Sequence, residues 1–397
     1  LEFLKHLPDD AERARQELPV LSALGLCLAA VKGWAAVELE PVYARTRELC
    51  VQIRDPALAF RSLCGQWLMR HWKLELHNAL ELADELLAAA QDAKDPPMFL
   101  VGNAMRGTTL FFLGELVSAK KHLEKSLAVF DLRQPLPAEL EAWRVGSFYF
   151  LPFVLYGLGH PDRAWAISRE MLEVAQRSSA PYVLAQASCQ AAEHNLMRGD
   201  GSAAQKRAEE AMALAEELGL VTFSATATSV NGAALIAQGR YEEGIAGMRR
   251  GISVCRATGG TPAASSLCHL ASGLGRIGRP QEGLQVLEEG FASVTKTGAQ
   301  LHSPWLHRVK GELLLAHDPS DVANAEKCFR AAVEIARRQS ARSIELRATT
   351  SLSRLLAKHG KHGEARTMLG DIYGWFTEGF DTADLKDAKA LLGELNE

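Results

Sequence analysis

A glycine recurs along this chain at a nearly constant interval. The recurring residues are Gly114, Gly159, Gly199, Gly239, Gly278 and Gly360. Successive gaps are 45, 40, 40, 39 and 82 residues, and the last is about twice the others, with a turn-like segment AHDPSD (316–321) lying between. A fixed period of this size predicts a solenoid, in which each repeat buries its apolar face against its neighbours.

A second pattern accompanies these glycines. Five residues after each one stands a small residue; the set is Ala119, Ala164, Ala204, Gly244, Gly283 and Ala365. Gly107 and Gly232 lie seven residues before a turn glycine. A glycine suits the left-handed conformation that ends a helix, and small residues let the next helix pack closely. This spacing is typical of tetratricopeptide helical hairpins, here with a period of about 40 instead of 34, and a HEAT-type array remains the alternative.

Apolar residues recur at helical spacing almost everywhere, and strand signals are nearly absent. The sequence therefore predicts an all-α, right-handed superhelical solenoid of eight to nine hairpins. Three regions are expected: an N-terminal hairpin in 1–55, repeats in 56–380 and a C-terminal capping helix in 381–397. The paired helices are predicted at 56–71 and 74–93, 97–113 and 115–130, 138–158 and 161–178, 181–198 and 202–218, 220–238 and 240–257, 261–277 and 280–297, 301–316 and 321–339, and 341–359 and 361–377.

One segment, ASGLGRIGRPQEG (271–283), has the G-x-G-x-x-G spacing of a dinucleotide site at Gly273, Gly275 and Gly278. That site needs a preceding strand, whereas the residues before this one have a helical pattern. We interpret Gly278 as a repeat turn and place Gly275 on the inner face of a first helix. The sequence thus predicts no nucleotide site here.

No other chemistry emerges from the motifs. The histidines and cysteines lack metal-ligand spacing, and no nucleophile motif has its required context. We expect no cofactor, no metal and no enzymatic activity in the chain itself. The net charge of −4 argues against a nucleic-acid partner. No apolar run is long enough for a membrane span, and scattered cysteines suit a reducing compartment, so a cytoplasmic location is expected.

The first helices of such repeats line a concave groove, and the turns locate their inward positions. The candidate binding residues are Tyr149, Phe153, Tyr156, Gln186, Glu193, Thr226, Ser229, Ser265, Trp305, Arg308, Glu312, Arg347 and Arg354. Ser272 and Thr350 belong to the same face. The lining suits an extended peptide, or a small effector whose acidic group meets an arginine. The alternative is that the aromatic residues pack between hairpins and the arginines pair with nearby glutamates.

Several segments resemble one family. They are DDAERARQELPVLSALGLCLAAVKGWAAVELEPVYARTRELC (9–50), LHRVKGELLL (306–315), AEKCFRAAVEIARRQSARSIELRATTSLSRLL (325–356) and DIYGWFTEGFDTADLKDAKALLGEL (371–395). Together they resemble the C-terminal tetratricopeptide-repeat region of large bacterial signalling ATPases. Those proteins carry an adenylate/guanylate cyclase domain or a winged-helix domain, then an AAA/STAND-type P-loop ATPase, then the repeats.

The resemblance implies a recognition role for this chain. It would bind a protein, peptide or small effector and signal to an ATPase upstream on a longer parent chain, where any ATPase or cyclase activity would lie. A purely structural scaffold or self-association module is the alternative function.

Overall fold

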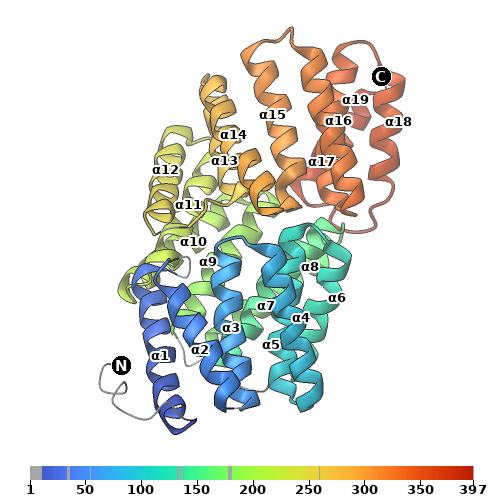
Figure 1. The fold of residues 1–397 in the computed structure, drawn as a ribbon. Helices are drawn as coiled ribbons and strands as arrows, with labels where there is room; N and C mark the ends of the chain where they lie inside the picture. The colour runs from blue at the N-terminus through green and yellow to red at the C-terminus, as the bar shows by residue number, and fades with distance from the viewer. Residues whose placement is uncertain are drawn as a thin grey trace.

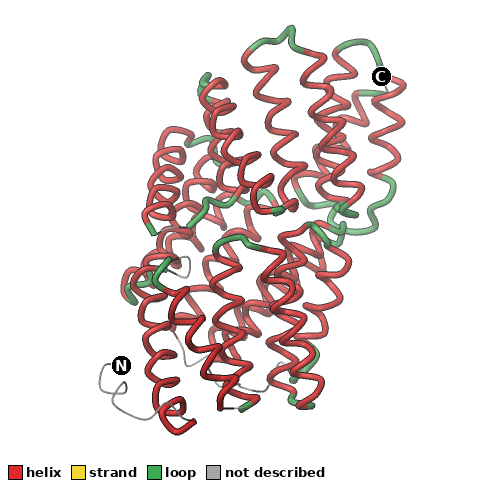
Figure 2. The backbone as a smooth tube through the Cα atoms, in the orientation of Figure 1, coloured by secondary structure: helices red, strands yellow, loops and turns green. Residues whose placement is uncertain are grey.

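The computed structural model describes residues 11–33, 36–53, 55–131, 134, 136, 138–177, 181–258 and 260–396. In these segments the chain forms helices and connecting turns without strands, as Figure 2 shows. The helices are α1 (Ala11–Lys32), α2 (Leu39–Ile53), α3 (Pro56–Trp72), α4 (Leu76–Ala93), α5 (Pro96–Leu113), α6 (Leu116–Leu127), α7 (Ala138–Gly157), α8 (Pro161–Arg177), α9 (Pro181–Arg198), α10 (Gly201–Glu217), α11 (Val221–Ala237), α12 (Tyr241–Ala257), α13 (Ala264–Arg276), α14 (Pro280–Thr297), α15 (Ser303–His317), α16 (Val322–Arg338), α17 (Arg342–Lys358), α18 (His362–Tyr373) and α19 (Ala383–Glu394). A short 3-10 turn, η2 (Gln300–His302), precedes α15. The predicted all-α solenoid is confirmed.

The recurring glycines end first helices, as the period predicted. Their φ angles lie between +75° at Gly278 and +92° at Gly159, in the left-handed region that favours glycine. At Gly114 the backbone N–H bonds back to Leu110 and Phe111, which satisfies carbonyls at the helix end. The turns therefore place each second helix antiparallel to the first.

Two helices, α3 and α5, begin directly after a capping aspartate and have proline at their first position. Asp55 accepts hydrogen bonds from the backbone N–H groups of Ala57 and Leu58 at the start of α3. Asp95 accepts one from Met98 at 2.9 Å at the start of α5. A capping carboxylate satisfies amides that lack helical partners, and proline tolerates the first position because it has no N–H.

The two helices of the fifth hairpin cross at glycine. A Cβ atom on Gly232 of α11 would lie 2.7 Å from the carbonyl oxygen of Gly244 on α12. A Cβ atom on Gly244 would lie 2.6 Å from the carbonyl oxygen of Gly232. The small residues at these predicted places therefore permit backbone contact between the helices.

The hairpins stack so that their first helices contact one another in sequence. Helix α5 packs against α7, α7 against α9, α9 against α11, and the series continues through α13, α15 and α17 to α19. Helix α19 thus takes the next place in the inner row. Figure 1 shows the resulting superhelix, in which α13–α19 stand above α3–α8 and α9–α12 join the two halves.

The superhelix returns to its own earlier repeats. Helix α17 contacts α7, and η2 contacts α5. The hydroxyl of Ser343 in α17 donates to the backbone carbonyl of Tyr156 in α7. These contacts join residues about 190 positions apart, so the C-terminal hairpins pack directly on the third hairpin.

Three helix boundaries differ from the predicted ones by three residues or more. Helix α6 ends at Leu127 instead of 130, and α18 ends at Tyr373 instead of 377. After α18 the chain leaves the helical path to contact α8. Helix α13 begins at Ala264 instead of 261, because Pro262 disfavours a helical conformation in the residue before it and Ala263 is extended. None of the described helices is both long and apolar enough to cross a bilayer.

Candidate functional site

A cavity of about 1170 Å³ lies on the inner side of the C-terminal hairpins. We call it the groove. Its polar and charged lining comes mainly from four inner helices: His269, Ser272 and Arg276 of α13; Trp305, Arg308 and Glu312 of α15; Arg347, Thr350, Ser351, Arg354 and Lys358 of α17; and Asp384, Asp387 and Glu394 of α19. Apolar side chains such as Leu313 and Leu391 complete it.

The groove brings together five of the thirteen candidate residues. Trp305, Arg308 and Glu312 on α15 and Arg347 and Arg354 on α17 all line it. Their spacings of three, four and seven residues place them on one helix face. Ser272, Thr350 and Gly275 line it too, and Gly278 lies in the turn that follows α13. The G-x-G-x-x-G segment is therefore part of a repeat, preceded by helix.

Three other candidates form a separate cluster on α7 and α9. The hydroxyl of Tyr149 donates to a carboxylate oxygen of Glu193 at 2.6 Å. The Tyr149 and Phe153 rings meet edge to face with centroids 5.1 Å apart. Burial raises the pKa of Glu193 to about 7, although the hydrogen bond from Tyr149 acts to lower that pKa. This cluster lies outside the lining of the groove.

The remaining candidates are placed differently from the expectation. Tyr156 is buried and directs its hydroxyl to Asp384. Ser229 is buried, donates to the carbonyl of Ala225 and packs beside Gly251 of α12, so its side chain faces the second helix. These two placements correct the sequence prediction, which treated both as open groove positions. Gln186, Thr226 and Ser265 are partly exposed on α9, α11 and α13, outside the groove lining.

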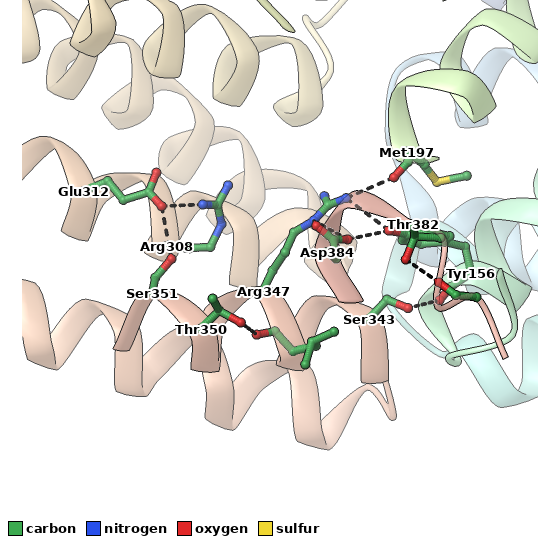
Figure 3. Close-up of polar contacts among 12 residues, drawn as sticks. Tyr156, Met197, Arg308, Glu312, Ser343, Arg347, Thr350, Ser351, Thr382 and Asp384 are labelled. Carbon is green, nitrogen blue, oxygen red and sulfur yellow. Dashed lines mark hydrogen bonds and ion pairs between the residues drawn. The ribbon is translucent and has the colours of Figure 1, made fainter. Parts of the chain in front are cut away.

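A row of polar side chains crosses the groove (Figure 3). It runs from Glu312 and Arg308 through Arg347 to Asp384 and Tyr156. Arg308 pairs with Glu312, which also accepts a hydrogen bond from Ser351 at 3.1 Å. Both arginines of this row are therefore paired with carboxylates of the chain itself. Arg308 has a nearby glutamate, as in the alternative interpretation, whereas Arg347 pairs with an aspartate 37 positions away.

Arg347 holds the centre of that row. Its Nε lies 2.7 and 2.8 Å from the two carboxylate oxygens of Asp384, and one terminal nitrogen donates to the carbonyl of Met197 at 3.2 Å. Burial acts to lower the pKa of Arg347, but Asp384 and Tyr156 outweigh it and the pKa is raised. The guanidinium stays charged and links α7, α9, α17 and α19.

The floor of the groove holds an aromatic cluster. The rings of His269 and Trp305 meet edge to face at 4.8 Å, with His302 beyond. Burial lowers the pKa of His269 to about 4, and the nearby charges of Arg347 and Arg308 act in the same direction. His269 is thus neutral at physiological pH. The Trp305 Nε1 is buried and has no hydrogen-bond acceptor among the described residues.

Two cations of the groove differ from its arginine pairs. Arg276 and Lys358 have no carboxylate within salt-bridge distance in the described part of the chain, whereas Arg354 pairs with Asp387. Within those same residues, no three His, Cys, Asp or Glu side chains group in a way that could hold a metal ion. The lining of the groove therefore combines arginine and lysine side chains with apolar walls.

Sequence reasoning missed the contribution of α19. Asp384 and Asp387 were placed in a capping helix and given no part in the groove. The available signal was their spacing: two acidic residues three positions apart share a helix face, as do the groove arginines Arg347 and Arg354 at seven positions. The sequence alone does not show that these two faces meet.

No protein-family model matches the chain, and no curated protein sequence matches it. Solved structures do. A Rap protein in complex with competence and sporulation factor is 12% identical, with a TM-score of 0.62 over 96% of this chain and 99% of that one. NprR in complex with its cognate peptide NprX is 10% identical, with a TM-score of 0.50 over 74% of this chain and 82% of that one.

A third match is a Signal Transduction ATPase with Numerous Domains (STAND) protein with a tetratricopeptide repeat sensor, from Pyrococcus horikoshii. It is 13% identical, with a TM-score of 0.51 over 98% of this chain and 55% of that protein. At these identities the likenesses show the fold alone. The chain is a tetratricopeptide-like helical solenoid.

Proposed function

We propose that this chain is a non-catalytic recognition module that binds a peptide, or a small effector, in the groove. The observation that carries the proposal is the groove itself, whose cations and apolar walls lie on the inner helices of a solenoid. Solenoids present their concave faces as extended binding surfaces. NprR, which shares the fold, was solved with a peptide.

We also propose that the module is the sensor of a larger bacterial signalling ATPase in the cytoplasm. The match to a STAND protein with a tetratricopeptide repeat sensor supports this placement, as does the sequence resemblance. In that arrangement the ATPase, and a cyclase or winged-helix output domain, lie upstream on the same chain. Residues 1–55 lead into the array, 56–380 form the repeats and 381–397 cap them.

The test begins with peptides selected on the whole chain from a phage-displayed random library. Their affinities are then measured by fluorescence anisotropy for the chain, for Arg308→Gln and for Arg249→Gln. Each variant removes one arginine from an Arg–Glu pair, but Arg308 lines the groove while Arg249 pairs with Glu282 on the second helices α12 and α14.

Selected peptides should bind Arg308→Gln at least about fivefold more weakly than the wild type, because a charge-assisted contact is lost. Arg249→Gln should leave binding unchanged. Equal affinities for all three proteins would place the peptide elsewhere and contradict the proposal. Failure to select any peptide, together with a stable dimer by light scattering, would favour the alternative, a scaffold or self-association module.

A further inference from the structure

Helix α19 presents acidic side chains to a groove whose other walls are basic. The inner helices α13, α15 and α17 contribute five cations against one carboxylate, Glu312, which is a net charge of +4. Helix α19 contributes three carboxylates, those of Asp384, Asp387 and Glu394. Without α19 the groove would be a strongly cationic surface, which concentrates anionic partners.

The carboxylates of α19 occupy two of the arginines. Asp387 pairs with Arg354, and both side chains are about half exposed, at 48% and 50%. Asp384 pairs with Arg347 through both carboxylate oxygens and is more enclosed. An exposed pair contributes only about 0.2–1 kcal/mol. A carboxylate from another molecule can therefore compete for Arg354 first.

The segment before α19 fastens the superhelix to its earlier repeats. Glu378 accepts hydrogen bonds from the backbone N–H groups of Asp162 and Arg163 at the start of α8. Gly379 donates its backbone N–H to Asp162 at 3.1 Å, and Arg198 of α9 pairs with Asp381 at 2.6 Å. We call these contacts, with the Asp384 contacts to Tyr156 and Arg347, the clasp.

Arg347 belongs to both the groove and the clasp. It lines the groove beside Arg308, while its partners Asp384, Tyr156 and the Met197 carbonyl hold the clasp closed. Figure 3 shows this position, with the groove residues on one side of Arg347 and the clasp residues on the other. A ligand that takes Arg347 from Asp384 therefore loosens the clasp.

We propose that the groove binds an extended acidic peptide whose carboxylates replace those of Asp387 and Asp384 on Arg354 and Arg347, and that this binding opens the clasp. The inference rests on the proposed function and adds the ligand's chemistry and its effect. Helix α19 acts as an internal competitor. Binding opens the clasp because the open state offers more unpaired cations to the peptide, which is the differential affinity that any population shift requires.

The geometry favours a peptide over a compact anion. The groove volume of about 1170 Å³ exceeds the usual range of about 300–1,000 Å³ for small-ligand pockets. Arg347 and Arg354 lie two helical turns apart, a rise of about 10.5 Å, which an extended chain spans in about three residues.

The first experiment measures binding of a blocked, fluorescein-labelled hexaglutamate peptide to the whole chain at low salt. Asp387→Asn removes the competing carboxylate, and Asp371→Asn on α18 is the control, because it removes an exposed carboxylate outside the groove. Affinity should rise by up to about fivefold in Asp387→Asn, which is the exposed-pair energy converted to a ratio. Asp371→Asn should bind like the wild type.

Three results overturn the proposal. Equal hexaglutamate affinity in the wild type and Asp387→Asn removes α19 as a competitor. Hexaglutamine binding as tightly as hexaglutamate removes the acidic preference. Tripolyphosphate competing as well as hexaglutamate assigns the site to polyanions of another class. If selected library peptides still depend on Arg308 in any of these cases, the proposed recognition function stands and only the present inference fails.

The second readout follows the clasp. Backbone amides of 160–164 and 375–384 should exchange hydrogen faster when hexaglutamate is bound, because the Glu378 and Gly379 hydrogen bonds are released. Exchange in the exposed outer helix α12 should not change. A bound peptide with unaltered exchange in both clasp segments would refute the coupling.

Discussion

Replacing Gly244 by alanine should destabilise this protein, although alanine is the better helix former. Gly244 lies in α12 where it crosses α11, and the added Cβ would lie 2.6 Å from the carbonyl oxygen of Gly232. It would also lie 2.9 Å from the backbone nitrogen of Ile236. Both atoms belong to a helix backbone, so neither can move aside as a flexible side chain would. The two helices must separate.

The size of the effect follows from two opposing contributions. Overpacking of this kind costs about 1–3 kcal/mol. Alanine returns up to about 1 kcal/mol of helix propensity relative to glycine. Because the clashing atoms belong to the backbone, we expect a cost in the upper half of that range, so Gly244→Ala should lower the free energy of unfolding by a net value of about 1–2 kcal/mol. Gly370→Ala in α18 should instead raise it by up to about 1 kcal/mol, because nothing lies within 4 Å of its Cβ position.

Urea unfolding followed by circular dichroism measures both changes. The comparison requires equal m-values, so that a shifted midpoint reports stability alone. The opposite signs of the two glycine substitutions are the critical result. A neutral or stabilising Gly244→Ala would show that α11 and α12 do not approach as closely as described, and the account of the repeat spacing would be wrong.

Three further predictions concern charge and capping. The fold raises the pKa of Glu193 to about 7, above its unfolded value of about 4.3. The contribution of Glu193 to the free energy of unfolding therefore falls as the pH rises from about 4.5 to 7. The free energy of unfolding of Glu193→Gln, relative to that of the wild type, should therefore rise by up to about 3 kcal/mol between pH 5 and pH 8, measured by unfolding at both pH values. A difference between the two proteins that is the same at both pH values would refute the burial of this carboxyl. Arg347→Met should lower stability by about 3 kcal/mol, because it leaves the Asp384 carboxylate enclosed without its cation; a melting temperature equal to wild type would contradict this. Asp95→Ala should cost about 1 kcal/mol through the lost cap of α5, and an unchanged urea midpoint would show that the cap contributes nothing.

The hairpins were predictable because their determinants are local. A turn glycine needs a left-handed φ, and a small residue five positions later needs a close helix partner, so both leave marks at a fixed period. Gly239 and Gly244 show this directly, with φ +82° at the first and backbone contact at the second. The same register also identified the inner face of α15 and α17, which carries Trp305, Arg308 and Arg354.

The closure of the superhelix was not predictable in this way. The Tyr156–Asp384 hydrogen bond joins residues 228 positions apart, and its existence depends on the accumulated twist of six hairpins. Small angular differences per repeat decide whether the two ends meet, and no periodic sequence signal encodes them. The placement of Ser229 was wrong for a local reason: Ser229 lies three positions before Gly232, so both residues share the face of α11 that packs on the second helix α12.

The most direct test of the account asks where a peptide binds. A photo-crosslinking p-benzoylphenylalanine is placed at Ser272, which lines the groove, or at Val254, an exposed residue of the outer helix α12. Each protein is irradiated with a library-selected peptide and analysed by mass spectrometry. We expect crosslinks from position 272 and none from position 254. Crosslinks from position 254 alone would contradict a peptide-binding groove on the inner face.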